Sequence, residues 1–350
     1  MKLLAVDVGT GTQDILLVDT RLDIENSFKM VLPAPTMIVH RRLELATRRK
    51  EPVLLTGVTM GGGPSAWAAE AHARAGLPIF ATPDAARSFN DDLEAVERDG
   101  IRVISDDEAR RLPTDVVRLE LRDFDFEAIQ AAFDRFGVDL DDLAAVAVAV
   151  FDHGAAPPNI SDRAFRFDYL DQRIRTNNRL SAFAFPAEDI PAEMTRLRAV
   201  ADSARDLPAP LVVMDTAPAA VLGATFDPHA AGLSHPLIAN VGNFHTLAFR
   251  LGPEGIEGVF EHHTGLLDRS KLEGLLRALA EGSLTRADVF DDMGHGALIY
   301  SSEPLPLEQP GALVVTGPRR ALLRGSSLRP HFAVPFGDMM IAGCFGLLAA

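Results

Sequence analysis

Residues 1–20 read MKLLAVDVGTGTQDILLVDT, and this stretch decides the fold. The apolar runs at residues 3–6 and 15–18 predict two short buried strands. Between these runs, Gly9 and Gly11 permit a tight hairpin and let backbone N–H groups approach a ligand closely. The chain is therefore expected to begin with a β-hairpin whose tip is polar.

The tip of this hairpin has the chemistry of a phosphate site. Thr10 and Thr12 add hydroxyl donors to the backbone N–H groups, and donors that converge in this way suit an anion. Asp7 stands where the first strand ends, a position suited to holding Mg²⁺ through water. The alternative is an ordinary polar hairpin that uses glycine only for its positive φ, because short glycine motifs also occur by chance.

Composition limits the possible partners. The chain has 350 residues, 47% of them hydrophobic and 24% charged, which is long enough for two globular domains. The net charge of −15 argues against a nucleic-acid surface or an anionic membrane as partner. A nucleotide remains compatible with this charge, because local N–H groups and Mg²⁺ can hold phosphate in an acidic protein.

The cysteine content and the apolar runs predict the compartment. Cys344 is the one cysteine, so a disulfide within the chain is impossible, which fits a reducing cytosol. The N-terminal apolar run is too short for a signal peptide, and apolar runs of about 18 residues are missing from the sequence. We therefore expect a cytoplasmic protein without a transmembrane helix; oligomer formation stays open.

A second hairpin of the same design follows in the other half of the chain. An apolar run at residues 237–239 leads into the sequence NVGNFHT and then into a further apolar run at residues 247–251. The polar tip supplies a second set of candidate ligand-binding residues. They are Asn240, Gly242, Asn243, His245 and Thr246.

Other polar residues also follow predicted strands. The run LAAVAVAVF at residues 143–151 predicts a doubly buried strand, and Asp152 at its end is a candidate general base or a simple turn cap. Residues 61–63, all glycine, either face a cleft or form a plain connection. The loop-rich segment 155–191 is either a lid or insertion, or surface structure, and residues 291–296 are expected to form an exposed turn.

The pattern Asp-x-Gly-Thr-Gly-Thr-x-Asp at residues 7–14 resembles the first phosphate loop of the actin-like ATPase superfamily, which includes sugar kinases, Hsp70 and actin. The second tip resembles the second phosphate loop, although Asn240 replaces its aspartate. Small-residue helices predicted at 215–224 and 336–348 resemble the two connectors between the lobes, and Gly317 matches part of the adenosine loop. The whole chain is also similar to DUF1786, a family of uncharacterised prokaryotic proteins often labelled pyruvate formate-lyase activating enzyme.

This resemblance implies an α/β fold with two ribonuclease-H-like lobes and a cleft between them. The N-terminal lobe would span residues 1–214, with the insertion near 155–191, and the C-terminal lobe residues 215–350. ATP and Mg²⁺ are the implied cofactors: Asp7 would bind the metal through water, residues 9–12 and 240–246 would hold phosphate, and Gly317 would border adenosine. Asp152 is the provisional base for a kinase, an ATPase or an ATP-driven regulator that acts with an unidentified small molecule or protein.

Two other interpretations stay open. Asn240 lacks the charge that attracts Mg²⁺, which motivates the alternative of a non-catalytic scaffold that only binds nucleotide. A metal-dependent hydrolase using His153, His262 and His263 is the least favoured, because His-x-x-x-His and zinc-finger spacings are missing and adjacent histidines in a strand point to opposite faces. The family label is rejected as a mechanism, since a radical enzyme needs three cysteines for its [4Fe–4S] cluster.

Overall fold

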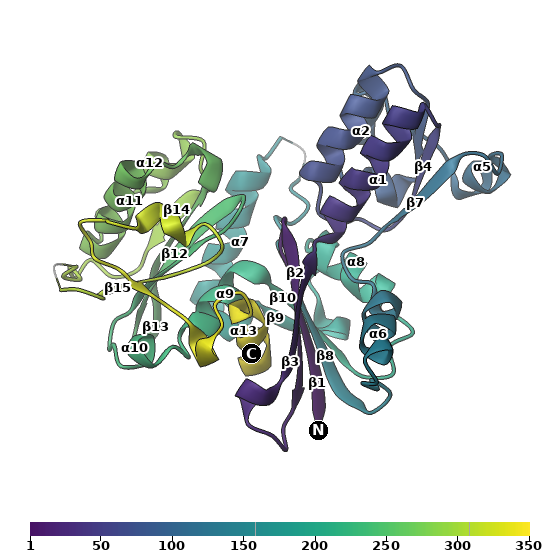
Figure 1. The fold of residues 1–350 in the computed structure, drawn as a ribbon. Helices are drawn as coiled ribbons and strands as arrows, with labels where there is room; N and C mark the ends of the chain where they lie inside the picture. The colour runs from purple at the N-terminus through teal and green to yellow at the C-terminus, as the bar shows by residue number, and fades with distance from the viewer. Residues whose placement is uncertain (158, 308) are drawn as a thin grey trace.

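Three β-sheets organise the described part of the chain, which comprises residues 1–157, 159–307 and 309–350 of a computed structural model. One sheet lies at the centre of Figure 1, a second lies in the green and yellow part, and the third lies beside α1. Within these ranges, none of the helices is both long enough and apolar enough to cross a bilayer.

The first two sheets repeat one topology. In each, a three-stranded antiparallel unit is followed by two parallel strands, and each sheet has one additional edge strand. The first sheet runs in the order β3 (Phe28–Pro33), β2 (Thr12–Asp19), β1 (Lys2–Val8), β8 (Leu143–Val150), β10 (Leu211–Asp215) and β9 (Ala184–Pro186). The second runs β14 (Gly296–Ile299), β13 (Gly255–His263), β12 (His245–Gly252), β11 (Leu237–Val241), β15 (Leu313–Thr316) and β16 (His331–Phe332). The predicted pair of ribonuclease-H-like lobes is therefore confirmed.

The third sheet belongs to a unit inserted into the first lobe between β3 and β8. Its order is β6 (Arg102–Val103), β5 (Ile79–Ala81), β4 (Val53–Gly57) and β7 (Val117–Leu121), with all strands parallel. The unit has its own apolar core, in which Leu43 of α1 (Pro35–Arg49) packs with Val53 and Leu55. This early insertion was not foreseen from the sequence.

The helices cover the sheets and join them. The remaining α-helices are α2 (Pro64–Arg74), α3 (Pro83–Ala86), α4 (Leu93–Arg98), α5 (Asp106–Arg111), α6 (Phe126–Arg135), α7 (Asp162–Thr176), α8 (Thr195–Ser203), α9 (Thr216–Ala224), α10 (Pro228–Ala231), α11 (Arg269–Glu281), α12 (Arg286–Phe290) and α13 (Ala342–Ala349). Short 3₁₀ helices occupy Ile24–Asn26, Leu180–Phe183, Ala187–Asp189, Thr264–Leu266, Arg320–Leu323 and Pro335–Gly337.

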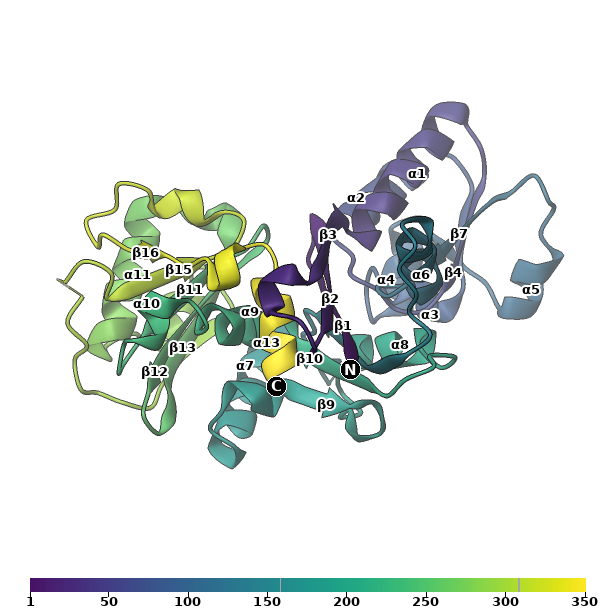
Figure 2. The same cartoon turned by 60° about the horizontal axis from the view of Figure 1, so that its bottom comes forward.

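Two small-residue helices cross between the lobes, as the resemblance implied. α9 and α13 lie side by side at the junction in both ribbon views (Figures 1 and 2). A Cβ on Gly223 would lie 1.7 Å from the carbonyl oxygen of Ala342, and one on Gly346 would lie 1.8 Å from that of Ala219. Only glycine therefore allows this close approach. The helix predicted at residues 336–348 begins later, at Ala342.

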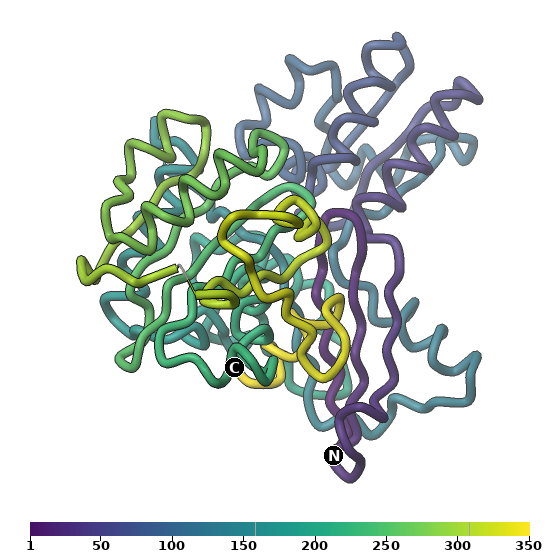
Figure 3. The backbone as a smooth tube through the Cα atoms, turned by 60° about the vertical axis from the view of Figure 1, so that its left-hand side comes forward, coloured from purple at the N-terminus to yellow at the C-terminus, as the bar shows by residue number. Residues whose placement is uncertain are grey.

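α13 also closes the core of the first lobe. It runs beside β1, near the purple hairpin of the tube view (Figure 3). The thiol of Cys344 donates to the carbonyl oxygen of Asp14 at 3.1 Å. Segments separated by most of the sequence therefore share one core.

The segment expected to be loop-rich, residues 155–191, contains the 15-residue helix α7; Pro158 within it lies outside the described residues. α7 packs against the second lobe, where Arg286 donates to Asp168 at 2.6 Å and Tyr300 donates to Asp171 at 2.8 Å. The segment therefore belongs to the interface between the lobes, and it is neither free surface nor plain loop.

Candidate functional site

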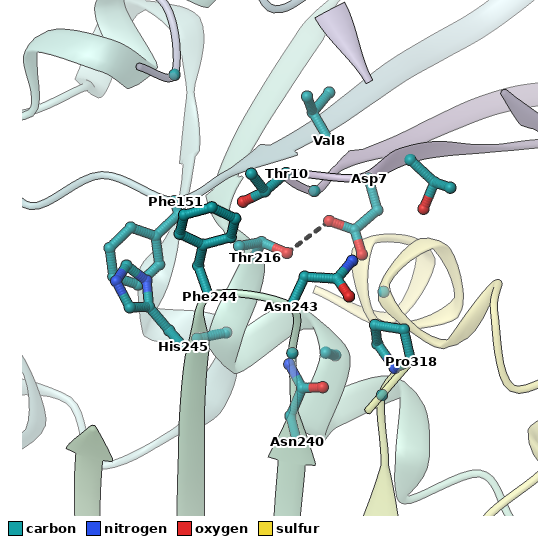
Figure 4. Close-up of a pocket in the computed structure, with 18 of the residues that line it drawn as sticks. Asp7, Val8, Thr10, Phe151, Thr216, Asn240, Asn243, Phe244, His245 and Pro318 are labelled. Atoms are coloured by element: carbon teal, nitrogen blue, oxygen red, sulfur yellow. Dashed lines mark hydrogen bonds between the residues drawn. The ribbon is translucent and has the colours of Figure 1, made fainter. Parts of the chain in front are cut away.

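The candidate site is a cavity of about 360 Å³ between the lobes. Both predicted hairpin tips line it, together with α9, the loop before α2, and the start of α13. Nine of the predicted residues are among those lining it, several of them labelled in Figure 4: Asp7, Gly9, Thr10, Thr12, Asn240, Gly242, Asn243, His245 and Gly317.

The two hairpin tips have the same internal geometry. The N–H of Gly9 donates to the carbonyl oxygen of Thr12 at 2.9 Å, and the N–H of Gly242 donates to that of His245 at 3.0 Å. Both glycines therefore close a turn across three residues, and the turns occupy equivalent places in the two repeated sheets. By this equivalence, Asn240 stands at the place of Asp7.

The two tips touch each other. A Cβ on Gly11 would lie 2.8 Å from Nδ2 of Asn243, so a side chain there would have to displace the Asn243 amide. Among the hydrogen bonds of the described residues, the backbone N–H groups of Thr10, Asn243 and Phe244 donate to no acceptor, while these residues line the cavity. The cavity wall therefore carries unused donors from both lobes.

Two buried carboxylates stand beside these donors. Burial raises the pKa of Asp7 to about 6, although a hydrogen bond from Thr216 opposes the shift. Burial and the nearby charge of Asp7 raise the pKa of Asp14 to about 8. Oδ1 of Asp14 is buried without a hydrogen-bond partner in the described part of the chain. The ionised forms of Asp7 and Asp14 are therefore unfavourable in this structure, and a bound cation would stabilise them.

The inserted unit contributes a third wall. Gly61, Gly62 and Gly63 line the cavity, which favours the cleft interpretation of this glycine run. Trp67 of α2 stacks on Phe244 with ring centroids 5.5 Å apart, so the insertion reaches the second lobe.

Arg196 lines the cavity as well. Its Nε atom donates to Asp123 at 2.6 Å, and its Nη1 atom donates to the carbonyl oxygen of Phe151 at 2.6 Å.

Three predicted residues lie elsewhere than expected. Asp152 does not line the cavity: its two oxygens accept from the N–H groups of Gly154 at 2.8 Å and Leu197 at 2.9 Å. Its position supports the turn-cap alternative, because both oxygens already hold the backbone. Thr246 is fully buried and bonded to Thr264 at 2.9 Å, and Gly11 contacts Asn243 without lining the space.

The histidines group differently from the triad His153, His262 and His263. His262 points away and bonds to Asp292 at 3.0 Å, because neighbouring side chains in a strand face opposite sides. Instead, one ligand atom each of His153, His245 and His295 lies within 4.8 Å of the others. His295 is fully buried, so the expectation of an exposed turn at residues 291–296 was wrong for this residue.

A buried ion network beneath the histidines was missed from the sequence. Arg166 of α7 donates from Nη1 to Asp215 and from Nε to Glu261, each at 2.6 Å. Its side chain is 1% exposed. Arg166 is one of several arginines in the segment 155–191, which was expected to be loop-rich. Its neighbours in the sequence do not indicate that it is buried, so only the tertiary fold reveals this network.

Comparison with protein families and structures places the chain as follows. The family described as "Putative pyruvate format-lyase activating enzyme (DUF1786)" matches residues 60–322. Comparison with curated proteins gives no match.

Among solved structures, the ethanolamine utilization protein EutJ from Carboxydothermus hydrogenoformans is similar at 11% identity over 99% of this chain and 89% of that chain, with a TM-score of 0.35. The ROK hexokinase from Thermus thermophilus is similar at 15% identity over 100% and 98%, with a TM-score of 0.31. Likenesses at these scores carry no conclusion about activity.

Proposed function

The chain belongs to the DUF1786 family, and we propose that it binds ATP together with Mg²⁺ in the cavity between its two lobes. The observation that carries the proposal is the set of unused backbone donors at two equivalent hairpin tips. The N–H groups of Thr10 and Asn243 have no acceptor in the described residues, and their tips belong to different lobes. Unpaired N–H groups on residues that line one cavity suit polyphosphate, whose oxygens accept from several donors at once.

The residues at the first tip also fit Mg²⁺. This ion prefers carboxylate and water oxygens, and Asp7 and Asp14 both line the cavity. The buried Oδ1 of Asp14, which lacks a partner among the described residues, supports the fit. Mg²⁺ would offset the repulsion between the two carboxylates and neutralise charge on the phosphates.

The apolar part of the cavity provides a place for a base. Pro318, Met339 and Met340 line it next to Gly317. Gly317 has a φ of +96°, and a Cβ there would lie 2.4 Å from Oδ1 of Asn240. The adenosine would therefore lie between the end of β15 and the start of α13, with its phosphates toward the hairpin tips.

Isothermal titration calorimetry with Mg-ATP tests this proposal. Asp7→Ala removes the carboxylate, and Gly11→Val displaces the side chain of Asn243 at the meeting point of the two tips; both are expected to weaken binding at least tenfold. Asp23→Ala and Gly265→Val repeat these changes at exposed positions and should bind as the wild type does. Absence of binding by the folded wild type, or unchanged binding by both cavity variants, would overturn the proposal.

A non-catalytic scaffold is the second candidate, and the position of Asp152 favours it. Both carboxylate oxygens of Asp152 are engaged by backbone, and Asn240 brings no charge to the second tip. Measurement of phosphate release by protein saturated with Mg-ATP separates the candidates. Binding without turnover would favour the scaffold, while turnover that is lost in Asp7→Ala would favour an ATPase or kinase.

A further inference from the structure

Three histidines from distant parts of the sequence meet at one side of the cavity. His153 follows β8 in the first lobe, His245 begins β12, and His295 directly precedes β14 in the second lobe. One ring nitrogen of each lies within 4.8 Å of the others. Figure 4 shows His245 beside Phe151, with Asp7 and Thr216 elsewhere around the same pocket. The cluster is thus assembled only when the lobes come together.

His295 is the member that ordinary packing does not explain. It is fully buried, yet both of its ring nitrogens lack a hydrogen-bond partner among the residues that the structure describes. A buried polar group without a hydrogen-bond partner destabilises the fold, so the position of His295 calls for a ligand. A metal ion is the ligand that a group of three converging imidazoles fits best.

The ion network below the cluster supplies the support that metal-bound histidines usually have. Nδ1 of His295 lies 3.5 Å from Oε1 of Glu261, and Oε2 of Glu261 accepts from Arg166. A carboxylate facing one ring nitrogen orients the other toward a metal. Oε1 of Glu261 likewise has no hydrogen-bond partner within the described ranges, so it is available for this role.

The charge of the ion network is offset internally. Arg166 is paired with two carboxylates, those of Asp215 and Glu261. The network therefore holds no guanidinium charge without a carboxylate partner.

We propose that His153, His245 and His295 bind one divalent transition-metal ion, with Zn²⁺ as the best match. Three imidazoles leave one position of a tetrahedral ion open, and His153 and His245 line the cavity, so this position would face the cavity and take water or a ligand oxygen. Zn–N bonds of about 2.0–2.1 Å place the nitrogens about 3.3 Å apart. The three rings would thus close in slightly on binding and tie the first lobe to the second.

Cobalt titration of tag-free protein, stripped of metal and without nucleotide, tests this site. Co²⁺ is expected to bind at one equivalent with visible absorption typical of nitrogen ligands in a tetrahedral site, and Zn²⁺ should displace it. His153→Gln and His245→Gln each remove a proposed ligand at a half-buried position. Each variant should weaken Co²⁺ binding by more than roughly 10–100-fold, which is the usual loss of affinity when only an outer-shell partner of a ligand is removed. His235→Gln, made at a histidine with a 40% exposed side chain, is the matched control and should keep full affinity.

Far-UV circular dichroism establishes that each variant is folded. A folded wild type that takes up neither Co²⁺ nor Zn²⁺ would overturn the proposal. So would a stoichiometric site that survives in both His153→Gln and His245→Gln. Zn²⁺ should in addition raise the melting temperature of the wild type but leave that of these two variants unchanged. Because nucleotide is absent throughout, failure here leaves the ATP proposal untouched, and the reverse also holds.

Discussion

Oγ1 of Thr216 donates a hydrogen bond of 2.6 Å to Oδ1 of Asp7. Thr216 opens α9, the helix that crosses between the lobes, and Asp7 lies at the base of the first hairpin tip. The charge state of the cavity is therefore coupled to the position of the crossing helix.

Thr216→Val should raise the pKa of Asp7 above its value of about 6, because the hydrogen bond from Thr216 stabilises the ionised carboxylate. The carboxyl ¹³C shift of Asp7 measured against pH reports this change. Thr225→Val removes a hydroxyl that donates to Leu222 at the end of the same helix and serves as control. An Asp7 titration that is identical in Thr216→Val and wild type would contradict the coupling.

Gly346→Ala should destabilise the fold by about 1–3 kcal/mol, because its Cβ would strike the carbonyl oxygen of Ala219 at 1.8 Å. Gly274→Ala, in the exposed part of α11 with open space around it, should instead stabilise by about 0.5–1 kcal/mol. Urea unfolding of the two variants measures both free energies of unfolding. Equal effects of the same sign would show that the contact between α9 and α13 is not tight.

Arg166→Met should cost about 3–5 kcal/mol of stability, because it leaves Asp215 and Glu261 as uncompensated buried charges. Arg175 on the same helix pairs with Asp171 at the surface, so Arg175→Met should cost only about 1 kcal/mol or less. Chemical denaturation of the two variants compares a buried with an exposed ion pair on α7. A loss no larger in Arg166→Met than in Arg175→Met would argue against the buried network.

Lower pH should weaken the fold through His72. This histidine is fully buried, and burial lowers its pKa below 6.5, so the unfolded chain takes up the proton first. The stability that neutral His72 contributes is present above pH 6.5 and is lost as the pH falls through its folded-state pKa. Unfolding free energies of wild type and His72→Gln, measured from pH 7.5 to 5, should converge toward acid. A constant difference would show that His72 does not titrate.

Much of the first tip could be predicted because its signals are local. The strands around Gly9 and Gly11, and the similar design near Gly242, are encoded by neighbouring residues, and the structure places both tips at one cavity. Asp152 illustrates the limit of such reasoning. The local sequence around a strand-end aspartate does not show whether its carboxylate faces solvent or accepts a backbone hydrogen bond. Here it accepts from the N–H of Leu197, which is 45 residues away.

The histidine cluster could not be assembled from the sequence for the same reason. His262 and His263 draw attention as neighbours, yet only the alternation of β13 decides which one faces the cavity. His295 lies in a Gly-rich turn that looks exposed until β14 pairs with β13 and buries it. The third sheet was not predicted as a separate unit, because the sequence of a single strand does not show which other strands it pairs with in parallel.

The contact between Cys344 and the first hairpin has a consequence for biosynthesis. The sulfur lies 3.6 Å from the carbonyl oxygen of Ala5, across 339 positions of sequence. A ribosome therefore extrudes β1 long before the helix that covers it exists, and the nascent strand waits with an apolar flank uncovered. The core of the first lobe is accordingly completed only after residues 342–349 have been synthesised.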